Sequence, residues 1–215
     1  MKRFPRRVPA QERSRERVAR ILDAAAHEFA ERGVEASTIE SIAERAKTSV
    51  GSIYQFFPNK LAIYEAIGEK YLEEVRALFA VLISDEAVAA LARRRNSDEI
   101  PWRDIIGATI DSFANLHRTS VTFRAIWSNI TYSRRFFDAG QAMNRELADR
   151  AEIVFGRLAK HVPSARRKLL ATVTIETMSA MLLLSADKPR VQANALLNEA
   201  KVLVERYLEP YLDSH

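Results

Sequence analysis

The sequence predicts an all-α protein in two parts, with three N-terminal helices in a helix-turn-helix arrangement and a longer helical C-terminal part. Apolar residues recur at helical spacing along most of the 215 residues. Only six glycines are present, which disfavours an all-β chain built on many tight turns. The hydrophobic fraction of 47% and the charged fraction of 28% are ordinary for a soluble globular protein.

The first thirteen residues are expected to form a flexible basic arm, because they hold Pro5 and Pro9 and show no helical period. Across the first twenty residues, Glu12 and Glu16 are the only acidic side chains. The basic ones are Lys2, Arg3, Arg6, Arg7, Arg13, Arg15, Arg17 and Arg20. Clustered positive charge implies a polyanion nearby, either nucleic acid or an anionic membrane surface.

A first helix is predicted from about Ser14 to Arg32, with Gly33 ending it as a left-handed cap. Its apolar stripe comprises Val18, Ile21, Leu22, Ala25 and Phe29. A second, short helix follows and stops near Ala46. The pattern Ser37-x-x-Glu40 predicts a capping box at its start.

A turn at 47–49 separates the second helix from a third, predicted at about 50–56. Ser49 is the expected N-cap of this third helix, and Ile53 and Phe57 are expected to point inward. Pro58 and Asn59 then break the chain before a fourth helix. Two short helices joined by a tight turn and backed by an earlier helix make a helix-turn-helix, although the pattern also fits a helical hairpin with no ligand.

The N-terminal third of the chain, about residues 14–70, resembles the tetracycline-repressor (TetR) family. The resemblance rests on Ile21-Leu22-x-Ala24-Ala25-x-x-x-Phe29-x-x-x-Gly33 and on Thr38-Ile39-x-x-Ile42-Ala43-x-x-Ala46-x-x-Ser49-x-Gly51-x-Ile53-Tyr54-x-x-Phe57-x-x-Lys60. The family commonly has Gly in the turn, where this chain has Lys47. A left-handed Lys costs about 1 kcal/mol relative to Gly.

The resemblance implies three phosphate contacts: the hydroxyl of Tyr54, the ammonium of Lys60, and the hydroxyl and N–H groups at Thr38. Base reading would fall to the exposed positions of the third helix and the residues that precede it. These are Thr48, Ser49, Val50, Gly51, Ser52 and Gln55. The amide of Gln55 suits an adenine edge, Val50 suits a thymine methyl group, and Gly51 suits close backbone approach.

In the C-terminal part, 84–100 reads as a short polar helix or loop, and Pro101 begins a new helix. Further helices are predicted at about 101–118, 121–129, 133–161, 164–186 and 190–209. The helix at 164–186 is apolar nearly all round. Glu176 and several hydroxyl groups within it favour a buried helix of a soluble protein over a membrane span.

Two apolar faces, on the last two helices, need cover. A four-helix bundle with a second copy of the chain is the simplest cover, and the resemblance implies the same twofold dimer. The alternative is that these helices only cap the monomer's own core. The expected interface comprises Val173, Ala180, Leu184, Leu196, Ala200, Leu203 and Tyr207.

Aromatic residues in the middle helices are candidates for an effector cavity, because such pockets are mainly apolar with a few polar groups. The alternative is ordinary core. The candidate lining is Trp102, Phe113, Phe123, Trp127, Phe137, Glu176 and Met178.

These patterns lead to the hypothesis of a transcriptional regulator, most simply a repressor, that binds double-stranded DNA as a homodimer and responds to an unknown small molecule. The expected domains are a basic arm at 1–13, a DNA-binding domain at 14–60 and an effector-binding and dimerisation domain at 61–215. The alternative is a helical adaptor or a protein of anionic membrane surfaces, although the first helix lacks the broad face of large apolar residues that membrane binding needs.

An enzyme is not expected. The four histidines are scattered, and no nucleophile elbow or phosphate-binding glycine loop occurs. No Glu-x-x-His or His-x-x-x-His pair suggests a metal, and no cofactor is expected. The absence of cysteine fits a reducing cytoplasm, and the basic N-terminus does not look like a secretory signal.

Overall fold

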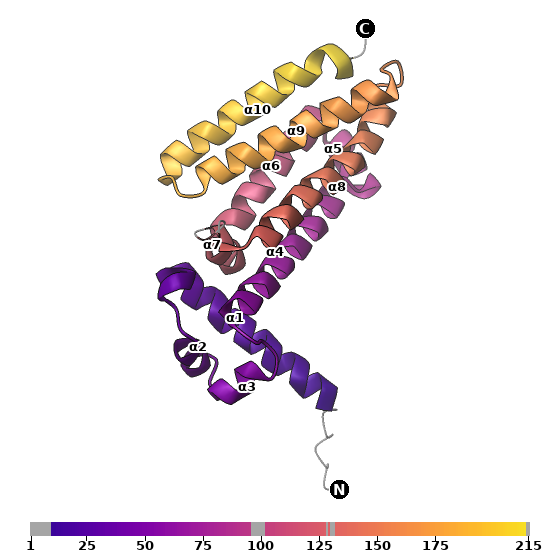
Figure 1. The fold of residues 1–215 in the computed structure, drawn as a ribbon. Helices are drawn as coiled ribbons and strands as arrows, with labels where there is room; N and C mark the ends of the chain where they lie inside the picture. Colours follow the sequence, from indigo (N-terminus) through magenta and orange to yellow (C-terminus); the bar gives the residue numbers. More distant parts are fainter. Residues whose placement is uncertain (1–9, 96–101, 128, 130–131, 214–215) are drawn as a thin grey trace, which may run out of the picture. The chain divides into compact units, whose positions relative to one another are not determined.

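The structure, a computed structural model, describes residues 10–95, 102–127, 129 and 132–213. Within these ranges the chain forms helices and no strands, which confirms the all-α prediction (Figure 1). The helices are α1 (Ala10–Ala36), α2 (Ile39–Arg45), α3 (Val50–Tyr54), α4 (Lys60–Leu82), α5 (Asp85–Arg95), α6 (Trp102–Thr119), α7 (Val121–Trp127), α8 (Arg134–Leu158), α9 (Ser164–Ser185) and α10 (Arg190–Leu212).

The chain packs into two compact units. The first comprises the residues up to Lys70 together with Val121–Arg134, and the second comprises Tyr71–Ser120 and Arg135–His215. The boundary predicted after Lys60 therefore lies ten residues before the boundary in packing. No pattern in the sequence predicted that α7 packs with the N-terminal helices in the first unit. The roles expected of the domains stay predictions.

Helix α1 begins at Ala10, so residues 10–13 of the expected arm are helical. Glu12 lies in the first turn, where a carboxylate interacts favourably with the helix dipole. The rest of the predicted arm, residues 1–9, lies outside the described residues. Gly33 interrupts α1 with φ 79° and ψ 159°. The expected positive φ is present, but ψ is extended rather than left-handed helical, a combination open essentially to glycine alone.

The backbone beyond Gly33 is held by α7 and its following turn. The N–H of Val34 donates to Oδ1 of Asn129 at 3.1 Å, and Nδ2 of Asn129 donates to the carbonyl of Ala125 at 3.1 Å. Helix α7 packs along α1. A segment almost a hundred residues away in sequence thus completes the first unit.

Tyr64 of α4 joins the parts of the first unit. Its ring is fully buried, lies 6.4 Å from the ring of Phe29, and makes an edge contact at 5.3 Å with the ring of Tyr132. Its hydroxyl donates to the carbonyls of Ile126 at 3.2 Å and Asn129 at 2.8 Å. Burial raises the pKa of this phenol, so the hydroxyl stays protonated and continues to donate.

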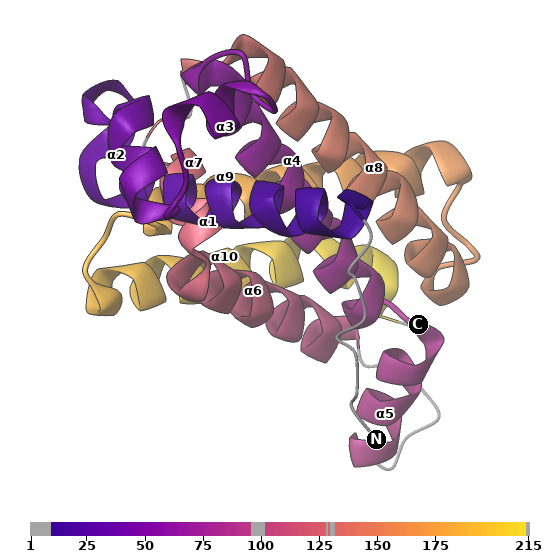
Figure 2. The same ribbon diagram turned by 90° about the horizontal axis from the view of Figure 1, so that it is seen from below.

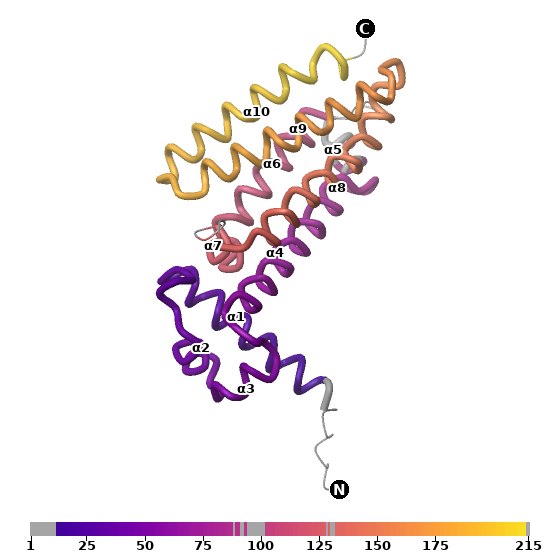
Figure 3. Tube along the Cα trace, in the orientation of Figure 1, coloured from indigo at the N-terminus to yellow at the C-terminus, as the bar shows by residue number. Residues whose placement is uncertain are grey.

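The second unit is a helical bundle in which α6, α9 and α10 lie against one another (Figure 2). Helices α9 and α10 run antiparallel after a chain reversal at 186–189, which the tube in Figure 3 follows. The core includes Phe79, Ile110, Phe113, Met143, Leu147, Phe155, Leu170, Ile175, Met178, Leu182, Leu197, Val204 and Leu208.

One helix among the described residues, α9, is long and apolar enough to cross a membrane by length and composition. Only 39% of its most apolar window is buried within the chain. The exposed side of α9 carries Leu169 and Leu184, which are 48% and 50% exposed, together with Glu176, and Leu203 of α10 is 47% exposed. An apolar surface of this kind needs a cover that the single chain does not provide.

Removing the Tyr64 hydroxyl tests its role in the first unit. Tyr64→Phe removes the hydrogen bonds from the hydroxyl to the carbonyls of Ile126 and Asn129, each of which keeps a backbone N–H donor, so we expect the free energy of unfolding to fall by about 0.5–1.5 kcal/mol in chemical denaturation. The control is Tyr54→Phe, since the side chain of Tyr54 is 52% exposed and the change there should stay within about 0.5 kcal/mol. Equal free energies of unfolding for the two variants would show that the Tyr64 hydroxyl does not stabilise the first unit.

Candidate nucleic-acid interface

The second helix of the motif begins with a capping box, one residue later than predicted. The N-cap is Thr38, whose Oγ1 accepts from the N–H of Ser41 at 3.1 Å, while the N–H of Thr38 donates to Oγ of Ser41 at 3.2 Å. Ser37, the predicted cap, is buried and donates its hydroxyl to the carbonyl of Gly33 at 2.6 Å. Thr38 is exposed at the start of α2, and its contact with a phosphate stays a prediction.

Helix α3 is shorter than predicted, ending at Tyr54, with Gln55 as its C-cap. Ser49 is the N-cap, as expected, and its Oγ accepts from the N–H of Ser52 at 3.2 Å. Ile53 is fully buried and Phe57 is 8% exposed, so both inward predictions are confirmed.

The outward side of this helix carries the residues predicted to read bases. Ser49, Gly51 and Gln55 are exposed, and Thr48, Val50 and Ser52 are half-buried. The Tyr54 ring, a predicted phosphate contact, is also exposed. The structure therefore places these predicted residues together on and just before α3, and their contacts with DNA stay predictions.

Gly51 is not required by packing within the chain. A Cβ atom built on it would find nothing within 4 Å, so no neighbour forbids a side chain. Alanine is also the better helix former. The open space above Gly51 is compatible with close approach by an external surface, and that role stays a prediction.

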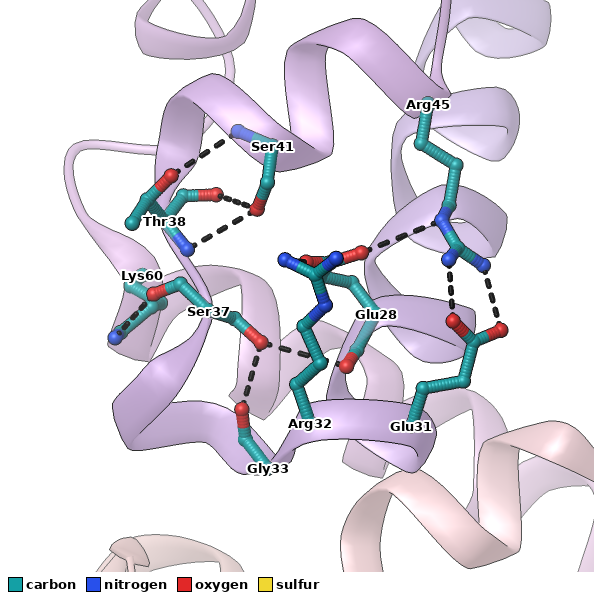
Figure 4. Close-up of polar contacts among 9 residues, drawn as sticks. All are labelled: Glu28, Glu31, Arg32, Gly33, Ser37, Thr38, Ser41, Arg45 and Lys60. Carbon is teal, nitrogen blue, oxygen red and sulfur yellow. Dashed lines mark hydrogen bonds and ion pairs between the residues drawn. The ribbon is translucent and has the colours of Figure 1, made fainter.

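Lys60 has a structural contact that the sequence did not predict. Its Nζ donates to the carbonyl of Ser37 at 2.7 Å (Figure 4) and to that of Glu35 at 3.1 Å, which ties the first residue of α4 to the α1–α2 linker and to the end of α1. An ammonium has three N–H donors, and these two bonds leave one for a phosphate.

A network of charges braces α1 against α2. Arg45 of α2 makes a two-pronged contact with Glu31, and its Nε lies 3.3 Å from Oε2 of Glu28 (Figure 4). The Glu28 side chain is only 3% exposed and also pairs with Arg32 at 3.4 Å. The hydrogen bond from Arg45 lowers the pKa of the Glu31 carboxyl below its ordinary value.

Sequence reasoning missed this brace, although one signal was available. Glu28 is a carboxylate directly before Phe29 on the apolar side of α1, where a buried charge requires a cationic partner. Nothing comparable pointed to Asn129.

Removal of the Arg45 guanidinium tests the brace. Arg45→Met leaves the buried Glu28 carboxylate with Arg32 alone, so we expect unfolding to become easier by about 1–3 kcal/mol in urea titrations. The matched control is Arg32→Met, where a side chain 63% exposed should contribute less than about 1 kcal/mol. Identical urea midpoints for the two variants would show that Arg45 does not carry the brace.

The candidate effector residues are divided between the two units. Phe123 and Trp127 belong to the first unit, where their rings stack at 6.1 Å. The other five belong to the second unit, and two of these five depart from the expectation. The ring of Phe137 is 43% exposed, and Glu176 is exposed and accepts from Nδ2 of Asn144 at 3.0 Å.

The remaining three candidates, Trp102, Phe113 and Met178, are buried in the second unit. Nε1 of Trp102 donates to Oδ1 of Asp213 at 3.1 Å. Their burial fits ordinary core as well as a cavity lining, so the effector cavity stays a prediction.

The expected dimer residues divide by exposure. Ala180, Leu184 and Leu203 are exposed, and Val173, Leu196 and Tyr207 are half-buried. Ala200 is 1% exposed, so its methyl group packs in the chain's own core instead of on a surface. Its neighbours at helical spacing, Leu197 and Val204, are buried as well.

Two family models match this chain. Residues 21–67 match the model of bacterial regulatory proteins of the tetR family, and residues 101–208 match a tetracyclin repressor-like C-terminal domain. The HTH-type transcriptional repressor KstR of Mycolicibacterium smegmatis is 39% identical over 61 residues, which is 28% of this chain and 30% of that repressor. The chain thus matches about a third of the length of this curated relative.

Solved structures share the fold over most of the chain. A TetR-family regulator from Pectobacterium atrosepticum has a TM-score of 0.67 and 18% identity, covering 97% of this chain and 99% of that one. The SmeT–triclosan complex has a TM-score of 0.66 and 22% identity, covering 93% of both chains.

Proposed function

The chain belongs to the TetR family of bacterial regulatory proteins, and we propose that it is a transcriptional repressor that binds DNA as a homodimer. The proposal rests on how the first unit holds and exposes α3. This helix is held by its buried Ile53 and its Ser49 cap, and it presents Gly51 and Gln55 outward with open space above Gly51. A short helix presented in this way fits the major groove.

Contacts to DNA divide into positioning and reading. Thr38, Tyr54 and Lys60 would bind phosphates and set the register of the protein on the duplex. Thr48, Ser49, Val50, Ser52 and Gln55 would lie nearest the base edges, with Gln55 the residue best suited to an adenine. Gly51 would allow the backbone of α3 to approach the groove closely.

A second copy of the chain would cover the apolar surface of α9 and α10. Leu169, Leu184 and Leu203 are each about half exposed in the single chain, and the exposed side of α9 also includes the half-buried Val173, Ala180 and the carboxylate of Glu176. A twofold four-helix interface would bury them and explain why a helix apolar nearly all round occurs in a DNA-binding protein. The dimer would hold two copies of α3 about one DNA turn apart, on a near-palindromic operator.

A small molecule in the second unit would release the repressor. An effector shifts the protein only through different affinity for the DNA-binding and released arrangements. The fold shared with SmeT, which has been solved with triclosan, supports small-molecule binding. Family membership favours a cytoplasmic regulator over an enzyme and over the membrane-surface adaptor that the sequence left open.

Gly51→Ala tests the close approach of α3 to DNA. Alanine should stabilise the free protein by about 0.5–1 kcal/mol, yet weaken binding to a site selected from random DNA by about 1–3 kcal/mol, because the new methyl group must fit a packed contact. Gel shifts and thermal melts measure the two effects.

The matched control for this variant is Gly140→Ala in α8, where an added Cβ likewise has nothing within 4 Å. It should be similarly stable and bind DNA as the wild type does. If Gly51→Ala also binds like the wild type, α3 does not approach DNA through Gly51. If the wild type enriches no DNA from the random pool, the repressor proposal fails.

Leu203→Glu tests the dimer. A carboxylate in the middle of the proposed apolar interface should convert the protein to a monomer in light scattering, while helical content is retained. Val81→Glu is the control, since Val81 is 64% exposed on α4 and should leave the dimer intact. A dimer that survives Leu203→Glu would place the interface elsewhere.

A further inference from the structure

Lys47 has a backbone conformation that its residue type disfavours. It lies in the turn between α2 and α3 with φ 50°, and it is the one non-glycine residue with positive φ in the described part of the chain. Glycine adopts this conformation without penalty, whereas a residue with a Cβ atom is strained. Strain of this kind is concentrated at functional sites, so the lysine side chain needs an explanation that the turn itself does not supply.

Lys47 lines a surface hollow of about 630 Å³ within the first unit. Helix α1 contributes Arg20, Asp23 and His27 to the hollow, and the end of α2 contributes Arg45. Arg45 is already directed onto Glu31 and Glu28, as Figure 4 shows.

The other two cations of the hollow are uncommitted. Arg20 and Lys47 are exposed, and neither has an ion pair or a side-chain hydrogen bond with any residue in the described ranges. One carboxylate, that of Asp23, stands among them. The hollow therefore offers two free cations against one anion, which favours a bound anion over an empty surface.

The position of Lys47 in the chain indicates which anion this is. Lys47 precedes Ser49, the N-cap of α3, by two residues. A chain that leads into a helix in the major groove must pass the row of phosphates at the groove edge. An ammonium at this turn would therefore lie beside the DNA backbone.

We propose that the hollow between α1 and the α2–α3 turn binds a backbone phosphate of DNA, with Lys47 as the main contact and Arg20 as the second cation. This inference rests on the proposed function, because it requires that α3 enters the groove. It adds Lys47 to the predicted DNA contacts, and it gives Arg20, one of the basic residues clustered near the N-terminus, a specific place in the interface.

Lys47→Gly is the direct test, with a DNA site selected from a random pool by the wild-type protein. Glycine relieves the backbone strain, so the thermal midpoint should rise or stay equal. Loss of one phosphate contact should lower the slope of log K against log salt by about 0.9 and weaken binding roughly fivefold to tenfold at 0.1 M salt. A purely structural role for Lys47 would leave this slope unchanged.

Two further variants sharpen the test. Asp23→Asn removes the carboxylate from the hollow and should strengthen binding about twofold to fivefold, because a phosphate there would no longer meet a like charge. Lys160→Ala removes the same unit of charge as Lys47→Gly from an exposed position in the second unit, and its salt slope should match that of the wild type.

The outcomes separate this inference from the proposed function. If the wild type binds its selected site and Lys47→Gly keeps the wild-type slope, the phosphate site is refuted while DNA binding stands. Weaker binding by Asp23→Asn would also count against it. If the wild type selects no DNA at all, both the site and the repressor proposal fail.

Discussion

A helix of five residues does not persist in water by itself, because the first turn fixes several residues for a single hydrogen bond. Helix α3 has this length, so its existence depends on burial of Ile53 in the three-helix core. Phe57 packs inward just beyond it, and the Ser49 hydroxyl satisfies the N–H of Ser52. The outward residues of α3 are thereby fixed in position before any ligand arrives, so that ordering α3 takes little from the free energy of binding.

The core that holds Ile53 is itself assembled from distant parts of the chain. Arg45 joins α2 to α1 through Glu31 and the buried Glu28, and Lys60 joins α4 to the linker between them. Asn129 and Tyr64 add α7 to the same unit. The DNA-binding unit is therefore discontinuous in sequence, and the chain passes between the two units at 70/71, 120/121 and 134/135. A conformational change in the second unit can therefore act on the first unit through three chain connections.

Local signals in the sequence predicted most of the helices and the arrangement of the motif. The Ser49 cap, the inward Ile53 and the helix breaks follow from the spacing and chemistry of neighbouring residues. Contacts between residues far apart were not predictable, because periodicity says nothing about which distant group meets which. Asn129 bonds Val34 across 95 positions of sequence, and Lys60 bonds Ser37 across 23. The same limit explains Glu176, whose place in an apolar helix suggested an interior role, whereas it is exposed and bonded to Asn144.

Native-state hydrogen exchange on the full-length protein without DNA tests most directly whether α3 is fixed in advance. The N–H of Ile53 bonds the carbonyl of Ser49, and the N–H of Phe57 bonds that of Ile53. Both amides should exchange only with opening of the three-helix core, at the same free energy as the N–H of Ile42 in α2. Exchange of Ile53 and Phe57 at the rate of an unstructured peptide, while Ile42 stays protected, would contradict a preformed recognition helix.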